Sequence, residues 1–337
     1  MVRGRLLAER AGSTVVLLFV VALVVFFAMR LLPGDPVDII LGNSGSASAS
    51  QVQALRASLH LDEPLGQQVL LFVSGLFHGD LGESITYREP VTAVILSRVP
   101  ATGELALAAV VFALIVAVPI GVLSATWRNS ILDRLAMTAS FVGIAMPGFW
   151  LGIVLIMVFA ARLRWLPVEG RAASGVLPLG PTGFFTLDAL LARNLPLFWS
   201  SLRYLVLPAI TMGAVMMAIL ARVIRSSMVE ELGKEYVTVA RAKGAGRRRV
   251  VVRHALRNAL IPAVTVFGLE LGTLLGGNMI VETVFSWPGL GRLAVDAIFK
   301  RDYPLVQGVV IVYACTFAVA NLAVDMAYTW LNPRVEG

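Results

Sequence analysis

The residues that could bind charged ligands gather in one stretch of this chain. Residues 235–262 read EYVTVARAKGAGRRRVVVRHALRNALIP and are rich in Lys and Arg, whereas the rest of the chain is strongly apolar. Arg247, Arg248 and Arg249 stand at the predicted start of a helix, where cations are unfavourable. An anionic partner should therefore compensate them, either lipid phosphates or an acidic protein. Nucleic acid is disfavoured as a partner, because Tyr236 is the only aromatic residue available for base stacking.

Residue types used for catalysis or metal binding are scarce and scattered. The three histidines, His60, His78 and His254, form no H-E-x-x-H or other metal-ligand motif. The sequence also lacks the G-x-S-x-G nucleophile motif and the G-x-x-x-x-G-K-[ST] phosphate loop. We therefore expect no catalytic residue, no metal site and no cofactor in this chain. Any ATP and Mg²⁺ must be bound by partner subunits.

The elements that position the basic stretch are predicted to be membrane helices. Of the 337 residues, 58% are hydrophobic and 15% are charged, and the apolar share exceeds the roughly 45–50% of soluble domains. Six apolar runs reach the length of about 20 residues that a spanning helix needs. They cover residues 11–31, 102–124, 137–161, 203–221, 259–281 and 305–330. The sequence thus predicts an all-α polytopic membrane protein with six transmembrane helices.

The distribution of Lys and Arg predicts the orientation of these helices. With the N-terminus inside, the inner segments carry basic residues at roughly three times the density of the outer segments, as the positive-inside rule requires. We therefore predict cytoplasmic N- and C-termini. Residues 1–32 form the N-terminal end and first helix, and residues 33–99 form an extracytoplasmic segment with short helices near residues 50–59 and from Pro64. Residues 100–337 form the core transmembrane domain, with a cytoplasmic loop at residues 222–258.

Acidic residues within the predicted spans are candidates for a functional role, because a charge is costly in lipid. Glu104 and Asp325 lie near span ends, which favours a structural role. Glu270 lies deeper, and either makes structural hydrogen bonds or lines a polar passage, for which Asn278 is a second candidate. No Lys, Arg or His within the spans accompanies the acidic residues.

A strip of glycines marks one predicted span. Gly268, Gly272 and Gly276 recur every four residues, which leaves a smooth helix face that another helix can approach closely. The strip either packs within this chain's own bundle or contacts a second membrane subunit.

The basic stretch itself predicts two short helices joined by a sharp turn. Glu235 suits the positive N-terminal end of the first helix, and Arg241 and Lys243 suit its C-terminal end. Gly244 is expected to follow in the left-handed conformation. A second helix from about Arg247 leads directly into a predicted span, so the segment can act as a lever on the membrane helices.

Several segments of the sequence, and their order along the chain, resemble those of a known family. EYVTVARAKG followed by RHALRNALIP is similar to the cytoplasmic EAA loop of permease subunits of ABC importers of the dipeptide, oligopeptide and nickel type. The segments RLLPGDPVD, HGDLGES, AMPGFWLG, VETVFSWPGLGRLAVDAIFKRDYPLVQG and NLAVDMAYTWLNPR resemble the same family in the expected order. The resemblance covers nearly the whole chain and implies the fold of a type I ABC importer permease.

The resemblance also implies which residues couple transport to ATP hydrolysis. In that family the loop forms a coupling helix that sits in a groove of the ATPase subunit. The residues implied for docking and coupling are Glu235, Tyr236, Ala240, Arg241, Lys243, Gly244, Arg247 and Arg248. Thr238 stands where the general motif has a glutamate, which leaves Glu235 as the acidic candidate.

The partners implied by the resemblance form a heteromeric importer in a prokaryotic plasma membrane. They are a second homologous permease, two ATPase subunits that bind ATP and Mg²⁺, and an extracytoplasmic binding protein that delivers small peptides. Nickel, glutathione or another small solute is the alternative cargo. The competing class is an ATP-independent secondary transporter, which would need ion-coupling groups or an inverted repeat, and neither is evident in the sequence.

Overall fold

The structure is a computed structural model that describes residues 2–31, 53, 56, 62–173, 180–276 and 279–331. Within these residues the regular structure is helical, and one isolated bridge pairs Glu83 with Pro90. The predicted all-α class is therefore confirmed. The chain divides into two compact units, which we describe separately. The first unit holds Met1–Pro100 and Gly289–Ala318, and the second holds Ala101–Pro288 and Val319–Gly337.

Five stretches of helix in the described residues are long and apolar enough to cross a membrane. They are Gly12–Leu31, Val91–Thr126, Leu195–Leu232, Arg247–Leu274 and Tyr303–Leu322. The helices concerned are α1 (Val2–Leu31), α5 (Val91–Thr126), α9 (Leu195–Leu232), α12 (Leu256–Gly276) and α15 (Tyr303–Leu331). Each overlaps a predicted span, but α5 and α9 extend well beyond the apolar runs from which those spans were predicted.

The helix predicted as one span over residues 137–161 is not continuous. α6 (Ile131–Ala145) is bent by 110° relative to α7 (Gly148–Leu155) and its continuation, the π-helix η1 (Ile156–Arg162). Pro147 explains the break, because the residue before a proline avoids the helical region of dihedral space. Met146 accordingly has φ −85° and ψ 125°. A sixth span exists only if this bent pair crosses the membrane as one unit.

In the first unit, α1 packs against α4 (Leu65–His78). The rings of Phe26 and Phe72 lie 5.2 Å apart, and Arg30 Nε donates a hydrogen bond of 2.7 Å to Gln68 Oε1. The helix predicted from Pro64 is thereby confirmed. The helix predicted near residues 50–59 falls almost entirely outside the described residues.

In the first unit, the buried carboxylate of Asp302 lies in the connection between α14 (Leu290–Phe299) and α15 and accepts several hydrogen bonds. Asp302 Oδ2 accepts hydrogen bonds from Ser84 Oγ at 2.6 Å and from the Thr86 amide at 2.9 Å. Its other oxygen accepts from the Leu305 amide at 3.2 Å, in the first turn of α15. Asp302 thus joins the loop before α5 to the start of α15.

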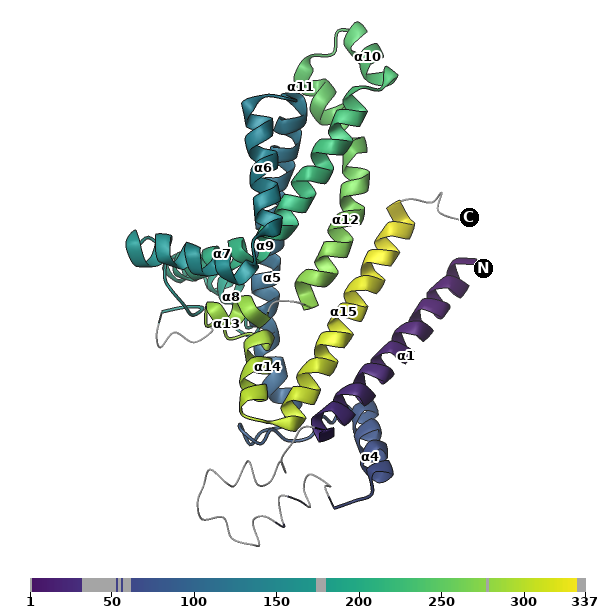
Figure 1. Cartoon of the computed structure of the whole chain (residues 1–337), viewed down its shortest axis with the longest axis vertical. Helices are drawn as coiled ribbons and strands as arrows, with labels where there is room; N and C mark the ends of the chain where they lie inside the picture. Colours follow the sequence, from purple (N-terminus) through teal and green to yellow (C-terminus); the bar gives the residue numbers. More distant parts are fainter. Residues whose placement is uncertain are drawn as a thin grey trace. The chain divides into compact units, whose positions relative to one another are not determined.

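The centre of the second unit is α9. The helices α6, α7, α8 (Phe185–Leu191), α12 and α13 (Met279–Val284) all contact it, and α6, α9 and α12 lie side by side in Figure 1. The short helix predicted for the sequence LDALLAR is confirmed by α8. Pro208 lies inside α9 without ending it.

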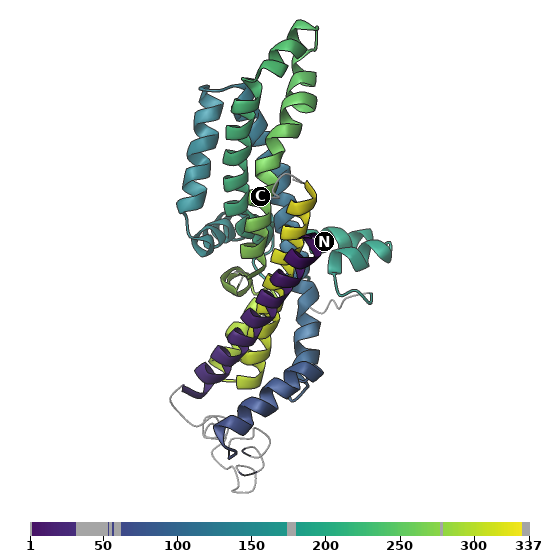
Figure 2. The ribbon, with the colours of Figure 1, turned by 90° about the vertical axis from the view of Figure 1, so that its right-hand side faces the viewer.

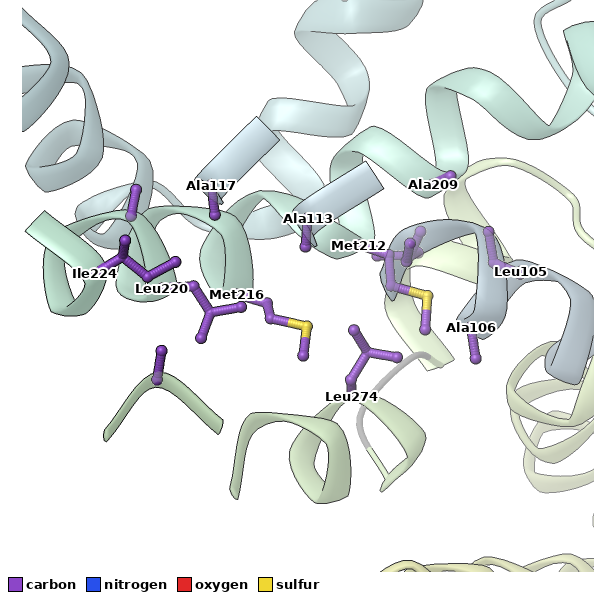
Figure 3. Packing of buried hydrophobic residues seen from close by; sticks show 14 of the residues in the cluster. Leu105, Ala106, Ala113, Ala117, Ala209, Met212, Met216, Leu220, Ile224 and Leu274 are labelled. Atoms are coloured by element: carbon purple, nitrogen blue, oxygen red, sulfur yellow. The ribbon is translucent and has the colours of Figure 1, made fainter. Parts of the chain in front are cut away.

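Small residues allow α5 and α9 to pack closely. Ala109, Ala113 and Ala117 recur every four residues on α5 and are fully buried, and Gly121 continues the strip. On α9, a Cβ atom added to Gly213 would lie only 2.6 Å from the Ala109 carbonyl oxygen. Figure 3 shows the larger side chains of the same core, including Met212 and Met216 of α9. The contact is of the kind that small residues at four-residue spacing give in membrane helices.

Candidate functional site

The basic stretch forms a compact helical cap in the second unit. α10 (Glu235–Ala242) follows α9 after a short turn, and α11 (Arg247–Arg249) runs through the π-helix η2 (Val250–Ala255) into α12. In Figures 1 and 2, α10 lies at the end of the α9 and α12 pair. The predicted pair of helices leading into a span is therefore present.

The turn after α10 has the geometry predicted for it. Gly244 has φ +81°, in the left-handed region. Its amide donates to the Arg241 carbonyl at 2.9 Å, and the Ala245 amide donates to the Ala240 carbonyl at 3.1 Å. This pair of hydrogen bonds is the Schellman motif, which satisfies carbonyls at the end of a helix. Glycine is favoured at this position because it has no Cβ atom.

The eight residues implied for docking do not share one face. Glu235, Arg241, Lys243, Gly244, Arg247 and Arg248 are exposed, whereas Tyr236 and Ala240 are half-buried on the side of α10 that also buries Val237. The exposed face of α10 also contains Thr238 and Val239, which are not among these eight residues. The outward surface therefore presents the Thr238 hydroxyl and the apolar Val239 side chain beside the basic residues Arg241 and Lys243.

Tyr236 is held by contacts inside the second unit. Its hydroxyl donates to Glu231 Oε2 at 2.6 Å and accepts from Asn258 Nδ2 at 3.2 Å. Lys234 Nζ lies 2.5 Å from Glu231 Oε1. Burial raises the pKa of Tyr236, and the neighbouring Glu231 carboxylate raises it further. The hydrogen bonds to Glu231 and Glu230 raise the pKa of Lys234, so Tyr236 and Lys234 both keep their protons at neutral pH.

The three arginines at the start of α11 differ in their surroundings. Arg247 Nη2 donates to the Thr126 carbonyl at 3.2 Å, and its guanidinium lies 5.9 Å from the centre of the Trp127 ring. The side chains of Arg248 and Arg249 are exposed and make no hydrogen bond or ion pair within the described part of the chain. Arg247 is therefore bound within the chain itself, whereas the charges of Arg248 and Arg249 are exposed.

An ion pair that the sequence did not reveal braces α6 against α9. Arg225 Nε and Nη2 donate to the two oxygens of Asp133, each at 2.8 Å. Asp133 Oδ2 also accepts from the Asn129 amide at 2.9 Å. Two parallel hydrogen bonds fix the orientation of both groups as well as their distance. The cap formed by α10 and α11 is thus built on a fixed helical base.

A second ion pair joins Glu104 to a basic residue far away in the sequence. Arg171, from outside the predicted spans, donates through Nε to Glu104 Oε2 at 2.8 Å, and both side chains are at least nine-tenths buried. The Thr186 amide donates to Glu104 Oε1 at 2.7 Å. The partner of Glu104 thus comes from outside the predicted spans, and the prediction that no Lys, Arg or His within the spans accompanies this residue is not contradicted. The side chain of Asp325 lies outside the described part of the chain.

The residues predicted to pack or to line a pathway lie on α12 or just after it. Gly268 and Gly272 are buried within this chain, and Glu270 is half-buried. Gly276 ends α12, and Asn278 lies outside the described residues. The described residues contain no group of three or more His, Cys, Asp or Glu side chains that could hold a metal ion.

Two family models cover almost the whole chain. Residues 117–337 match the binding-protein-dependent transport system inner membrane component, and residues 1–108 match the N-terminal part of the corresponding membrane component. Curated relatives match over nearly their full lengths. The di/tripeptide transport system permease protein DppB of Pseudomonas aeruginosa (strain UCBPP-PA14) is 45% identical over 331 residues, which is 98% of each chain.

Two further relatives agree with this match. The dipeptide transport system permease protein DppB of Escherichia coli (strain K12) is 42% identical over 97% of each chain. The glutathione transport system permease protein GsiC of Escherichia coli O6:H1 is 40% identical over 95% of this chain and 94% of its own. The apolar helices, the basic cap and these matches together show that the chain belongs to the family of binding-protein-dependent transport permeases, as a multi-pass membrane subunit of an ABC importer.

Proposed function

We propose that this permease subunit carries small peptides. The observation that supports the proposal is the 45% identity, over nearly the whole chain, to a permease named for di- and tripeptide transport. A permease named for glutathione transport is 40% identical, which makes glutathione the second candidate cargo.

Substrate-stimulated ATP hydrolysis tests the cargo. The assembled complex is reconstituted in lipid vesicles with its binding protein and exposed in turn to dialanine, trialanine and reduced glutathione. We expect the alanine peptides to stimulate hydrolysis and to be taken up. Stimulation by glutathione alone would favour the second cargo, and stimulation by none of the three would contradict both.

We infer that the importer is assembled from several chains. This subunit pairs with a second homologous permease and forms half of the translocation pathway, in which Glu270 and Asn278 are candidate lining residues. Two ATPase subunits bind ATP and Mg²⁺, so this chain is not itself an enzyme. The family description, which names a binding-protein-dependent system, and the absence of a phosphate loop from the sequence support this division of labour.

We place the ATPase contact on the outward face of α10 and α11. The exposed residues proposed to make it are Glu235, Arg241, Lys243, Arg247 and Arg248. Gly244 shapes the turn between the two helices. Exposed Val239 adds an apolar side chain to this surface. Such a surface suits a groove with acidic walls, because complementary charge steers association and fixes register.

The topology proposed here has residues 33–99 outside the cell and the segment 222–258 in the cytoplasm. Single cysteines at Asp62 and Thr238, both exposed positions, test it after replacement of the chain's single cysteine, Cys315, by serine. In intact cells we expect a membrane-impermeant maleimide to label the Asp62→Cys protein and to leave the Thr238→Cys protein unlabelled until lysis. The reverse pattern would contradict both the topology and the coupling site.

A further inference from the structure

The Tyr236 hydroxyl lies where three helical segments meet. It donates to Glu231 in the last turn of α9, and it accepts from Asn258 in the first turn of α12. The carbonyl oxygen of His254, in η2, lies 3.4 Å from the same hydroxyl. A single phenol oxygen therefore connects α10 with the end of α9 and with the start of α12.

The direction of the side chain argues against a contact with another subunit. Tyr236 and Val237 face the chain's own helices, and Val237 is 1% exposed. Glu235, Thr238 and Arg241 face outward on the same helix. The donor and acceptor capacity of the phenol is already used within this chain, so the residue has little left to offer a partner.

The hydrogen bonds around the Tyr236 hydroxyl hold the three helical segments firmly together. Glu231 is buried, and its two oxygens are divided between Lys234 and Tyr236. Hydrogen bonds to a carboxylate are shorter and stronger than those between neutral groups. A displacement of α10 therefore moves the end of α9 with it, because breaking the link would leave a buried carboxylate oxygen without its donor.

The segment on the other side of the junction is a π-helix. Turns of this kind are rare and occur mostly as short insertions within α-helices, often at functional sites. η2 lies between α11 and α12, and the Tyr236 hydroxyl reaches its fifth residue, His254, and Asn258 a turn later. Movement of α10 thus acts on the place where the basic cap becomes a membrane helix.

We propose that Tyr236 is a positioning residue that passes displacement of α10 to α9 and α12, and that it does not touch the ATPase subunit. The inference rests on the proposed function of α10 as the docking helix. It assigns different roles to neighbouring residues of one short helix. The outward residues hold the partner, and Tyr236 converts the partner's movement into movement of the membrane helices.

The Tyr236→Phe variant tests this assignment in the complete importer, with both permeases, the ATPase subunits and the binding protein in lipid vesicles. The measured quantities are ATPase subunit retention, ATP hydrolysis and uptake of dialanine and of reduced glutathione. We expect full retention and continued hydrolysis, with uptake per ATP reduced by about tenfold, since the lost hydrogen bond to a charged group corresponds to at least that factor. Tyr204→Phe is the matched control, because the Tyr204 hydroxyl has no hydrogen-bond partner within the described residues.

Two further variants separate the outcomes. The double variant Arg241→Glu and Lys243→Glu should lose the ATPase subunits; if it retains them, the proposed docking face is wrong, whatever Tyr236→Phe does. A combined Glu231→Gln and Tyr236→Phe protein should lose less coupling than the sum of the losses in the two single variants, because the two side chains share one hydrogen bond. Unchanged uptake per ATP in Tyr236→Phe, or loss of ATPase subunits from it, would overturn the positioning role.

Discussion

Two regions of the second unit depend on glycine for different physical reasons. In the contact between α5 and α9, a Cβ atom on Gly213 would lie 2.6 Å from the Ala109 carbonyl oxygen, and one on Gly121 would lie 2.7 Å from Ile224 Cγ2. After α10, a Cβ atom on Gly244 would meet nothing within 4 Å, but φ is +81°. The first region requires glycine for space, whereas the second requires it for backbone conformation. The same residue type therefore predicts different tolerance to substitution.

The largest cost to the folded chain is expected at the α5–α9 contact. Gly213→Leu forces the two helices apart, and overpacking typically costs about 1–3 kcal/mol. Gly213→Ala should also destabilise, because a backbone carbonyl cannot move aside as a flexible side chain can. Thermal unfolding of the purified subunit in detergent measures both effects.

Gly148→Ala is the matched control for Gly213→Ala. Gly148 begins α7, and a Cβ atom there would meet nothing within 4 Å. This change should be neutral or stabilise by up to about 1 kcal/mol, through the reduced flexibility of the unfolded chain. Equal unfolding temperatures for the two alanine variants would contradict the inference that Gly213 is needed because a Cβ atom does not fit there.

The glycine strip of α12 should give the next largest effect. Gly268→Leu and Gly272→Leu add bulk at buried positions, with an expected cost of about 1–3 kcal/mol if the strip packs within this chain. Leu269→Ala, at an exposed position of the same helix, serves as the control and should leave the unfolding temperature of the isolated subunit unchanged. Normal stability of the leucine variants with loss of pairing to the second permease would assign the strip to the subunit interface.

A smaller cost to stability is expected at Gly244. A non-glycine residue in the left-handed conformation costs about 1–2 kcal/mol, and a β-branched residue resists it most. Gly244→Val should therefore distort the turn and reduce uptake per ATP, while the membrane helices remain folded. Gly244→Asn should stay near wild type, since asparagine tolerates this conformation. If both variants transport equally well, the backbone requirement inferred from φ does not matter for coupling.

The smallest cost to the folded chain is expected from charge reversal on the outward face. Arg241→Glu and Lys243→Glu replace exposed side chains, so the unfolding temperature of the subunit should change little. Binding of the ATPase subunits should fall strongly, and more so at low salt, where repulsion is less screened. Co-purification at two salt concentrations measures the effect. A neutral pair, Arg241→Gln and Lys243→Gln, should bind at an intermediate level.

Composition predicted the helical class and five of the spans because length and apolar content alone decide whether a helix can cross a bilayer. The short helix α10 and its left-handed glycine were also predictable, since capping depends on residues that are close in sequence. The break before Pro147 could be predicted only in part. The sequence shows the proline, but it does not show whether Met146 becomes extended, which ends the helix, or whether the helix continues with a kink.

Long-range pairing could not be predicted from the single sequence. Arg225 pairs with Asp133 across 92 residues, and nothing in the local sequence of either one indicates the other. The hydrogen bond between Tyr236 and Asn258 could not be predicted for the same reason, because the two residues lie on different helices. The α5 strip of Ala109, Ala113 and Ala117 did have a visible signal, a small residue at every fourth position, which is as regular as the glycine strip of α12.

The buried pair of Glu104 and Arg171 has a consequence for the order of events during synthesis. The two residues are 67 positions apart, so at about 5–20 residues per second the ribosome adds the arginine roughly 3–13 s after the glutamate. A lone carboxylate is costly within a bilayer. Glu104 therefore gains its charged partner only after the segment that follows η1 has been made, and we expect an Arg171→Ala chain to accumulate in the membrane at a lower level than the wild type.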